Sequence, residues 1–67
     1  MKRRPPTSGP IVVERHDCEG GAISYELWDY GPNTYHRLCT LSDDDNRHAK
    51  RDAELLARAA NNLLGIP

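Results

Sequence analysis

The chain has 67 residues, a formal net charge of −1 and 37% hydrophobic residues, with no Phe and a single Trp. A domain of this length buries only about 60% of the surface that its unfolded chain exposes, so we expect a thin core. Because positive and negative charges balance, the chain has no overall positive field that would attract nucleic acid or an acidic membrane. It also has no run of about 18 apolar residues that could span a bilayer.

The first ten residues combine Lys2, Arg3 and Arg4 with proline, glycine and serine. This composition is typical of disorder and lacks the apolar region of a secretory signal, so we expect a basic, proline-rich arm over residues 1–10. A single domain is expected over residues 11–67. Two cysteines without a signal segment favour a reduced environment, which predicts a soluble, cytoplasmic protein.

Three segments have the pattern of β-strands. The first, residues 11–16, begins with three β-branched residues, and the glycines of Glu19–Gly21 suit the tight reversal that follows it. We favour a loop of three residues, Glu19–Gly21, which makes Ile11 and Val13 face the core. A slip of one residue would place Val12 there instead.

The second and third strands are predicted to meet at a turn centred on Pro32 and Asn33, because Pro presets φ and Asn tolerates the left-handed region. This turn sets Tyr30 opposite Tyr35. The register then gives the pairs Trp28–Arg37, Leu27–Leu38, Glu26–Cys39 and Tyr25–Thr40. One face of the predicted sheet carries Ile23, Tyr25, Leu27, Leu38 and Thr40, and the other carries Glu26, Trp28, Tyr30, Tyr35 and Arg37.

The rest of the chain predicts one helix over residues 43–64. Ser42 is the expected N-cap, and the three carboxylates that follow it would lie in the first turn, where the helix dipole favours them. An apolar stripe then recurs at helical spacing, made of Ala49, Ala53, Leu56, Ala57, Ala60, Leu63 and Leu64, with Leu55 outside it. Gly65 is expected to end the helix.

The order of these elements predicts an α+β domain, in which a three-stranded antiparallel β-meander packs on one C-terminal α-helix (βββα). The small alanines let the helix approach the sheet closely, so the larger Tyr25, Leu27 and Leu38 are expected to fill the space between them. One helix covers only one face of a sheet. The other face is therefore expected to lack a cover within the chain.

The uncovered face is the predicted site. Trp, Tyr and Arg are the residue types most enriched at binding hot spots. We therefore predict a partner-binding surface made of Glu26, Trp28, Tyr30, Tyr35 and Arg37. Trp28 beside Arg37 is expected to form a cation–π pair. The alternative is that these residues are ordinary cross-strand pairs that stiffen an exposed sheet.

Two charged runs are candidates for contacts beside this surface. Asp43, Asp44 and Asp45 are predicted to assist partner binding by meeting a basic surface; the alternative is a helix N-terminal turn that obeys the dipole. The basic run at residues 2–4 is interpreted as a solvated tail, because three charges give only weak, salt-sensitive binding to nucleic acid.

Four residues are candidate metal ligands: His16, Cys18, His36 and Cys39. Zinc needs ligands converging to about 2.3 Å from one point. His36 and Cys39 are expected on opposite faces, and Cys18 about 13 Å along the strand direction from Cys39, so neither a metal site nor a disulfide is predicted. Cys39 with His36 or His48 lacks the pocket that nucleophilic catalysis needs. We therefore predict no enzymatic activity and no cofactor.

The run from Asp52 to Leu64, DAELLARAANNLL, resembles the closing helix of many small proteins encoded by tailed bacteriophages and prophages. Those proteins commonly end in an alanine- and leucine-rich pattern such as NARLIAAAPELL after two or three short strands. Asn61 and Asn62 stand where that pattern has an Ala-Pro step. The resemblance implies a phage-type accessory protein of the bacterial cytoplasm. Several small phage proteins, anti-CRISPR proteins among them, inhibit host defence by stoichiometric binding.

Three hypotheses for function remain. The first is a small non-enzymatic inhibitor or adaptor that docks a larger host protein or ribonucleoprotein through the uncovered face. The second places the same face at a homodimer interface, which would suit a thin core. The third is single-stranded nucleic-acid binding by base stacking on the rings, although Arg15 and Arg37 are the only cations expected near them.

Overall fold

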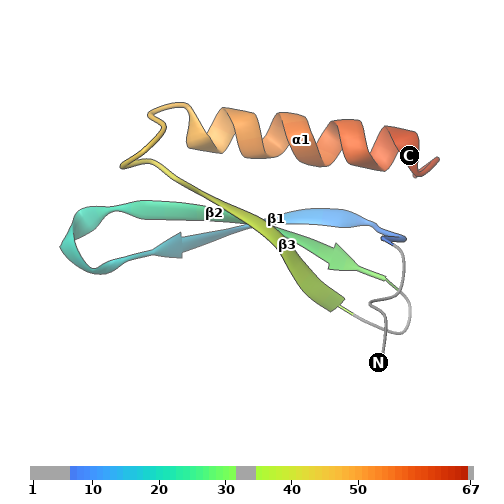
Figure 1. The fold of residues 1–67 in the computed structure, drawn as a ribbon, viewed down its shortest axis with the longest axis horizontal. Helices are drawn as coiled ribbons and strands as arrows, with labels where there is room; N and C mark the ends of the chain where they lie inside the picture. The colour runs from blue at the N-terminus through green and yellow to red at the C-terminus, as the bar shows by residue number, and fades with distance from the viewer. Residues whose placement is uncertain (1–6, 32–34, 67) are drawn as a thin grey trace, which may run out of the picture.

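A computed structural model describes residues 7–31 and 35–66 of the chain. Its elements are three strands and one helix: β1 (Ile11–Asp17), β2 (Ile23–Tyr30), β3 (Tyr35–Ser42) and α1 (Ala49–Leu63). The strands form one antiparallel sheet in the order β1-β2-β3, and α1 lies along one face of it (Figure 1). This arrangement confirms the predicted α+β class and the βββα order.

The loop between β1 and β2 has the three-residue form that the sequence favours. Asp17 lies opposite Ile23, and the amide of Cys18 donates to the carbonyl of Ala22 at 2.8 Å across the loop Glu19–Gly21. Its two glycines adopt φ values of 85° and 90°, a region that other residues rarely enter. Because the loop fixes the register, Ile11 and Val13 face the core as predicted.

The hairpin of β2 and β3 begins in the predicted register and then departs from it. Tyr30 lies opposite Tyr35, and Trp28 lies opposite Arg37, as expected. The register then shifts at Leu38, where β3 carries one extra residue as a β-bulge. The predicted turn residues Pro32 and Asn33 lie outside the described residues.

The bulge overturns the predicted pairs beyond it. The pairs are Leu27–Cys39, Glu26–Thr40 and Tyr25–Leu41, instead of Leu27–Leu38, Glu26–Cys39 and Tyr25–Thr40. Two members of the predicted core face are therefore wrong. Leu38 is 36% exposed and Thr40 is exposed, while Leu41 packs against the core in their place.

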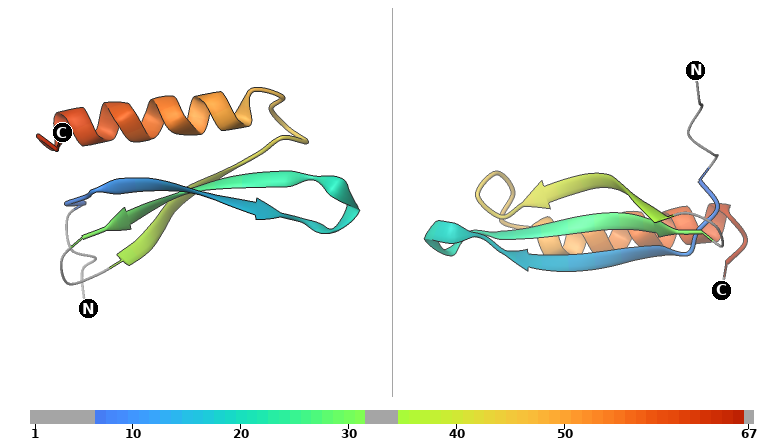
Figure 2. Two further views of the ribbon diagram at one scale, coloured as in Figure 1. Left: turned by 180° about the vertical axis from the view of Figure 1, so that it is seen from behind. Right: turned by 90° about the horizontal axis from the view of Figure 1, so that it is seen from below.

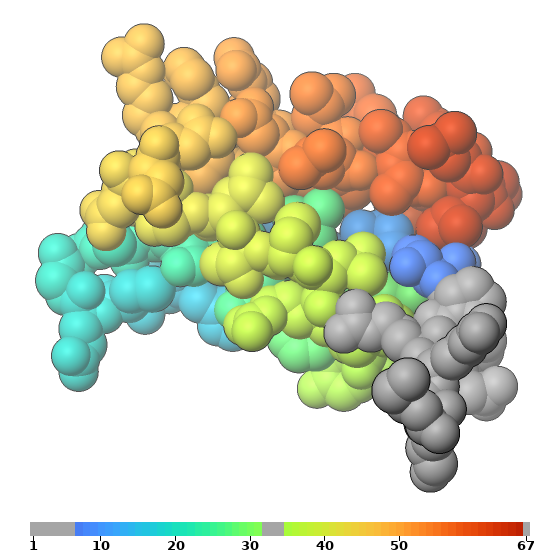
Figure 3. Space-filling model, in the orientation of Figure 1, coloured from blue at the N-terminus to red at the C-terminus, as the bar shows by residue number. Residues whose placement is uncertain are grey.

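The core lies between α1 and the sheet. Its buried members are Ile11, Tyr25, Leu27, Ala49, Ala53 and Ala57, with Val13, Ile23, Leu41 and Ala60 packed against them. In agreement with the prediction, the helix presents alanines, and the sheet supplies the larger side chains. In the space-filling view, α1 forms one layer and the strands form the other (Figure 3).

The helix begins later than predicted. Ser42 is not its N-cap, because the strand pairing continues past Ser42: the amide of Asp43 donates to the carbonyl of Ile23 at 3.0 Å, and the Asp43 carboxylate accepts from the Ile23 amide at 2.9 Å. A turn follows, in which the side chain of Asn46 accepts from the His48 amide and donates to Asp52. Helix α1 starts only after this turn.

The leucines of α1 lie mainly outside the core. Leu56 is 48% exposed and Leu63 is 90% exposed, so their predicted place in the buried stripe is wrong. The buried line is Ala49, Ala53 and Ala57, at a spacing of four residues. The alanine line brings the helix backbone close to the sheet, which leaves no room for larger side chains there. Gly65 follows the helix at φ 76°, in agreement with its predicted role as the stop.

The segment before β1 is held against the sheet. The buried carboxylate of Asp29 accepts hydrogen bonds from the amides of Ser8 at 3.1 Å and Gly9 at 2.6 Å, and the Tyr30 amide donates to the carbonyl of Pro10. The predicted disordered arm, residues 1–10, is therefore anchored from Ser8 onward. Its residues 1–6, with the basic run, lie outside the described part of the chain.

A second anchor joins the two ends of the fold. The side chain of Asn61 accepts from the amide of Ile11 at 2.7 Å and donates to the carbonyl of the same residue at 3.1 Å. It thereby completes the backbone pairing at the start of β1. Asn61 thus ties the C-terminal part of α1 to the start of β1.

Candidate functional site

The sheet face turned away from α1 carries no helix or strand of the described chain, and the right-hand view of Figure 2 looks directly at it. We call it the open face. Because side chains alternate along a strand, it is formed by Val12, Glu14 and His16 from β1, Ser24, Glu26, Trp28 and Tyr30 from β2, and Tyr35, Arg37, Thr40 and Ser42 from β3. All five sheet residues predicted as the binding surface lie on it.

Three aromatic rings form a cluster at one end of the open face. Trp28 and Tyr35 stack, with ring centroids 4.9 Å apart and planes at 26°. Tyr30 meets Tyr35 edge to face, at 5.4 Å and 81°. Such contacts contribute about 0.5–1.5 kcal/mol beyond the area they bury. The cluster remains accessible, since Tyr35 is 65% exposed.

Glu26 lies at the centre of the polar part of the open face. One carboxylate oxygen, Oε1, accepts from the indole Nε1 of Trp28 at 2.9 Å, and the other, Oε2, accepts from Nη1 of Arg37 at 3.2 Å. Arg37 therefore pairs with Glu26, while Trp28 stacks on Tyr35. These contacts stand in place of the predicted cation–π pair.

The same contacts determine the ionisation of Glu26. The Trp28 hydrogen bond is the largest cause that holds the pKa of the Glu26 carboxyl below its usual 4.5, and Arg37 and His16 act in the same direction. Partial desolvation acts in the opposite direction and is outweighed. Glu26 is therefore a carboxylate at neutral pH, fixed in orientation by two donors.

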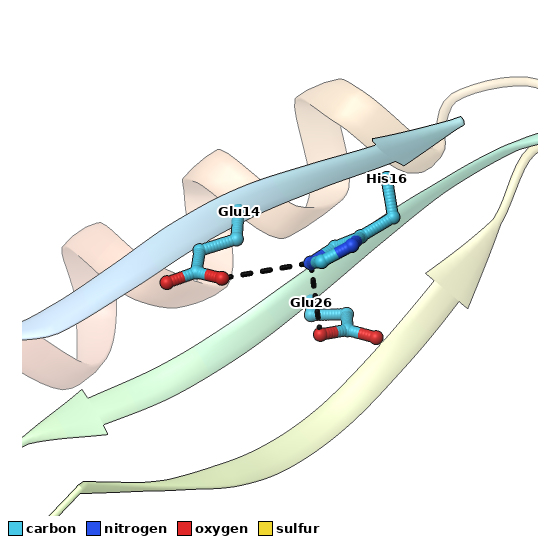
Figure 4. Close-up of side chains that lie close together, drawn as sticks. All are labelled: Glu14, His16 and Glu26. Atoms are coloured by element: carbon cyan, nitrogen blue, oxygen red, sulfur yellow. Dashed lines mark ion pairs between the residues drawn. The ribbon is translucent and has the colours of Figure 1, made fainter.

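His16 reaches Glu26 from the neighbouring strand (Figure 4). Its Nε2 lies 3.2 Å from Oε1 of Glu26 and 3.5 Å from Oε1 of Glu14. Glu14 lies directly opposite Glu26 in the ladder, and His16 lies two residues further along β1. Glu14 and His16 come from the outer strand β1, and Glu26 comes from the central strand β2.

The group formed by Glu14, His16 and Glu26 was not predicted, although the sequence contains the pattern that brings these residues together. A three-residue loop sets Glu14 opposite Glu26, and the period of two along β1 then puts His16 on the same face. As a candidate metal ligand, His16 is grouped above with Cys18, His36 and Cys39. In the structure, its neighbours are carboxylates.

The other three candidate metal ligands, Cys18, His36 and Cys39, do not join His16 in this group. Cys18 and Cys39 are both free and exposed, and the Cys18 thiol hydrogen-bonds with Ser24 at 3.2 Å. His36 lies opposite Asp29 on the covered side of the sheet, with its Nε2 buried 3.9 Å from Oδ2 of Asp29. The structure thus separates the two histidines onto opposite faces.

The acidic run lies away from the aromatic cluster. Asp43, Asp44 and Asp45 follow the last residue of β3, whereas Tyr35 is its first, so the strand separates them by about 23 Å at roughly 3.3 Å per residue. Asp43 is engaged in pairing with Ile23, while Asp44 and Asp45 are exposed. Within this run, Asp44 and Asp45 are therefore the residues that could meet a partner.

Comparison of the chain with protein-family models, curated proteins and solved structures gives no match. Within residues 7–31 and 35–66, no pocket is formed and no helix combines the length and hydropathy needed to cross a bilayer. The candidate site is thus a flat surface of aromatic rings bordered by a charged cluster.

Proposed function

We propose that this chain is a small non-enzymatic protein that binds a larger protein, or the protein part of a ribonucleoprotein, through the open face. The observation that carries the proposal is the placement of Trp28, Tyr30 and Tyr35. Apart from Tyr25 in the core, these are all the aromatic residues of the chain, and they gather in one accessible cluster.

The contacts within the cluster support docking with little ordering cost. Trp28 is already held by its stack on Tyr35 and by its bond to Glu26. Immobilising a free side chain on binding costs about 0.5–1.5 kcal/mol, and a ring that is already held avoids much of that cost. Glu26 and Arg37 would supply the polar rim beside a hot spot of aromatic anchors.

The acidic run fits the same proposal at the rim. A standard interface covers about 800 Å² on each partner, which is wide enough to reach from the rings to the far end of β3. Asp44 and Asp45 would meet basic groups of the partner there, and this would raise the association rate more than the affinity. Asp43 contributes chiefly to the fold.

The resemblance of the C-terminal helix to small phage and prophage proteins supplies the biological setting of the proposal. In that setting the partner is a host protein of the bacterial cytoplasm, and binding inhibits or redirects it, as anti-CRISPR proteins do with their targets. This part of the proposal depends on the resemblance. The docking face depends on the geometry and stands without it.

Direct nucleic-acid binding is the weaker alternative. The rings stack on one another, and the guanidinium of Arg37 is paired with Glu26. A stacking platform for bases normally lies in a basic groove, whereas Glu14 and Glu26 lie beside these rings. Titration of the protein with a single-stranded oligonucleotide at low salt should therefore leave the fluorescence of Trp28 unchanged.

Affinity capture from a bacterial lysate, followed by mass spectrometry, tests the docking proposal. Trp28→Ala and Arg37→Glu should abolish capture of a specific protein while leaving the helical circular dichroism signal nearly intact. Leu63→Ala is the matched control, because it removes an exposed apolar side chain from α1 on the other side of the molecule. Capture that survives Trp28→Ala, or that is lost only in Leu63→Ala, contradicts the proposal.

The homodimer alternative is separated by light scattering on the purified protein. A monomer that captures a partner is the expected result. A dimer that dissociates on Trp28→Ala would instead assign the open face to a second copy of this chain.

A further inference from the structure

Three potential metal ligands converge on the open face, independently of any docking partner. Oε1 of Glu14, Nε2 of His16 and Oε1 of Glu26 all lie within 4.8 Å of one another, and Figure 4 shows the three side chains directed toward one point between β1 and β2. An imidazole nitrogen and two carboxylate oxygens are ligand types that bind divalent transition metals in proteins.

The distances match those of a metal centre. Zinc bonds to imidazole nitrogen and carboxylate oxygen are about 2.0–2.1 Å long, so two ligands of a tetrahedral ion lie roughly 3.3 Å apart. His16 Nε2 lies 3.2 Å from the Glu26 oxygen and 3.5 Å from the Glu14 oxygen. Two of the three ligand-to-ligand distances are therefore already at the required value. The third, between the two carboxylate oxygens, is within 4.8 Å and shortens when the half-buried side chain of Glu14 rotates toward Glu26.

We infer that Glu14, His16 and Glu26 form a site for a divalent transition-metal ion of the Zn²⁺ type, with its remaining coordination positions open on the accessible face. The set is too small and too rich in nitrogen for Ca²⁺, which takes six to eight oxygen ligands, and Mg²⁺ rarely accepts imidazole.

The surroundings of Glu26 prepare it for this role. Trp28 donates to the proposed ligand oxygen and Arg37 to the other oxygen, so both are occupied by donors that hold the carboxylate in place. Hydrogen bonds of this kind to a ligating carboxylate orient it and typically affect metal affinity by about 10- to 100-fold. Arg37 adds one positive charge nearby, which two carboxylates outnumber.

The cross-strand pair of glutamates gives a further reason for a cation here. Glu14 and Glu26 lie directly opposite each other, and like charges in that position destabilise a sheet. A bound divalent ion removes the repulsion. Because the ion binds the folded sheet and not the dispersed ligands of an unfolded chain, Zn²⁺ is expected to raise the melting temperature.

Calorimetric titration of the purified full chain with ZnCl₂ at neutral pH, together with Trp28 fluorescence, tests the inference. The expected result is one Zn²⁺ bound per chain, with a change in the emission of Trp28, whose indole is bonded to a ligand. His16→Ala should weaken binding by about 100-fold or more, and Glu14→Gln by about 10-fold or more. The rise in melting temperature with Zn²⁺ should be smaller in His16→Ala and Glu14→Gln than in the unsubstituted protein.

Two control variants test whether Zn²⁺ binds at this site and not at other potential ligands. His48→Ala removes an exposed histidine at the start of α1 and should leave Zn²⁺ binding unchanged. Cys18→Ser should also leave it unchanged, and the Co²⁺-loaded protein should lack a thiolate charge-transfer band. Circular dichroism of each variant shows that it is folded before it is titrated.

Three results would overturn the inference. The first is the absence of both heat and fluorescence change on adding Zn²⁺. The second is a folded His16→Ala or Glu14→Gln variant that binds as tightly as the unsubstituted chain. The third is binding that is lost in Cys18→Ser or that gives a thiolate band with Co²⁺, because the ion would then belong to a thiol site.

Discussion

The two faces of the sheet are built in opposite ways. The covered face meets three buried alanines of α1, and its most completely buried large side chain is a carboxylate, Asp29, at 0% exposure. The open face carries the single Trp, two of the three Tyr residues and most of the paired charges. The comparison shows that large side chains lie on both faces of the sheet, and that α1 approaches the covered face through small residues.

The helix repeats this contrast on its own surface. Ala49, Ala53 and Ala57 are buried, while Leu55, Leu56 and Leu63 are 48–90% exposed. Hydrophobicity alone would have placed the leucines inside. The small space between α1 and the closely packed sheet excludes them, because overfilling a core also destabilises the fold.

The largest effect is expected from removing the carboxylate of the covered face. Asp29→Ala leaves the amides of Ser8 and Gly9 without an acceptor, and hydrogen bonds to a charged group contribute about 1.5–3 kcal/mol each. Since a domain of this size has a total stability of about 3–5 kcal/mol, the variant should be mostly unfolded or nearly so. Urea denaturation followed by Trp28 fluorescence measures this.

Asp29→Asn is the matched variant, because it keeps one oxygen acceptor for Gly9 and should retain roughly half of the lost stability. An unchanged urea midpoint in Asp29→Ala would show that the segment before β1 contributes nothing to the fold.

A smaller effect is expected from adding volume between α1 and the covered face. Ala53 is fully buried, so Ala53→Leu should lower the free energy of unfolding by about 1–3 kcal/mol through overpacking. Leu63→Ala, at a side chain that is 90% exposed, should change it by less than about 0.5 kcal/mol. The contrast between the buried and exposed sides of α1 would be contradicted if Leu63→Ala lowered the free energy of unfolding more than Ala53→Leu does.

The smallest effect concerns the open face and depends on pH. The pKa of Glu26 is lowered in the folded state, chiefly by the Trp28 hydrogen bond, so its ionised form stabilises the fold above the usual value of 4.5. That contribution is lost as the pH falls through the lowered pKa. The urea midpoint should therefore fall below pH 4.5, and the fall should be smaller in Glu26→Gln.

Asp52 provides a reference for this measurement. Its pKa is also lowered, from 3.8, first by the hydrogen bond from Asn46, so part of the acid sensitivity belongs to the entry of α1. Asp52→Asn should remove that part and leave the Glu26 part in place. A stability difference between the unsubstituted chain and Glu26→Gln that stays constant as the pH falls would contradict the assignment to Glu26.

The architecture and the composition of both faces of the central strand were predictable from local patterns. The alternation from Ile23 to Trp28 placed Leu27 and Trp28 on opposite faces of the sheet. The turn predicted after Tyr30 placed Tyr30 opposite Tyr35. A loop with two glycines fixed the register of β1. Each of these signals lies within a few residues of the feature that it determines, which explains why they sufficed.

The features that could not be predicted depend on contacts across the fold. On each side of the bulge at Leu38, the residues of β3 alternate as in a regular strand. The local sequence therefore does not show where the register shifts. The late start of α1 follows from the pairing of Asp43 with Ile23, twenty residues away. The burial of Asp29 follows from two amides that precede β1. Each requires knowledge of which segments meet in space.

The bulge in β3 also affects how the outer edge of the sheet could pair with another molecule. β3 is an outer strand of the sheet, and a regular outer strand can recruit a strand from another molecule and begin a fibre. The extra residue at Leu38 interrupts the even ladder of free amides and carbonyls and increases the local twist. The aromatic cluster is therefore accessible on a sheet whose outer strand β3 is a poor template for strand pairing with another copy of the chain.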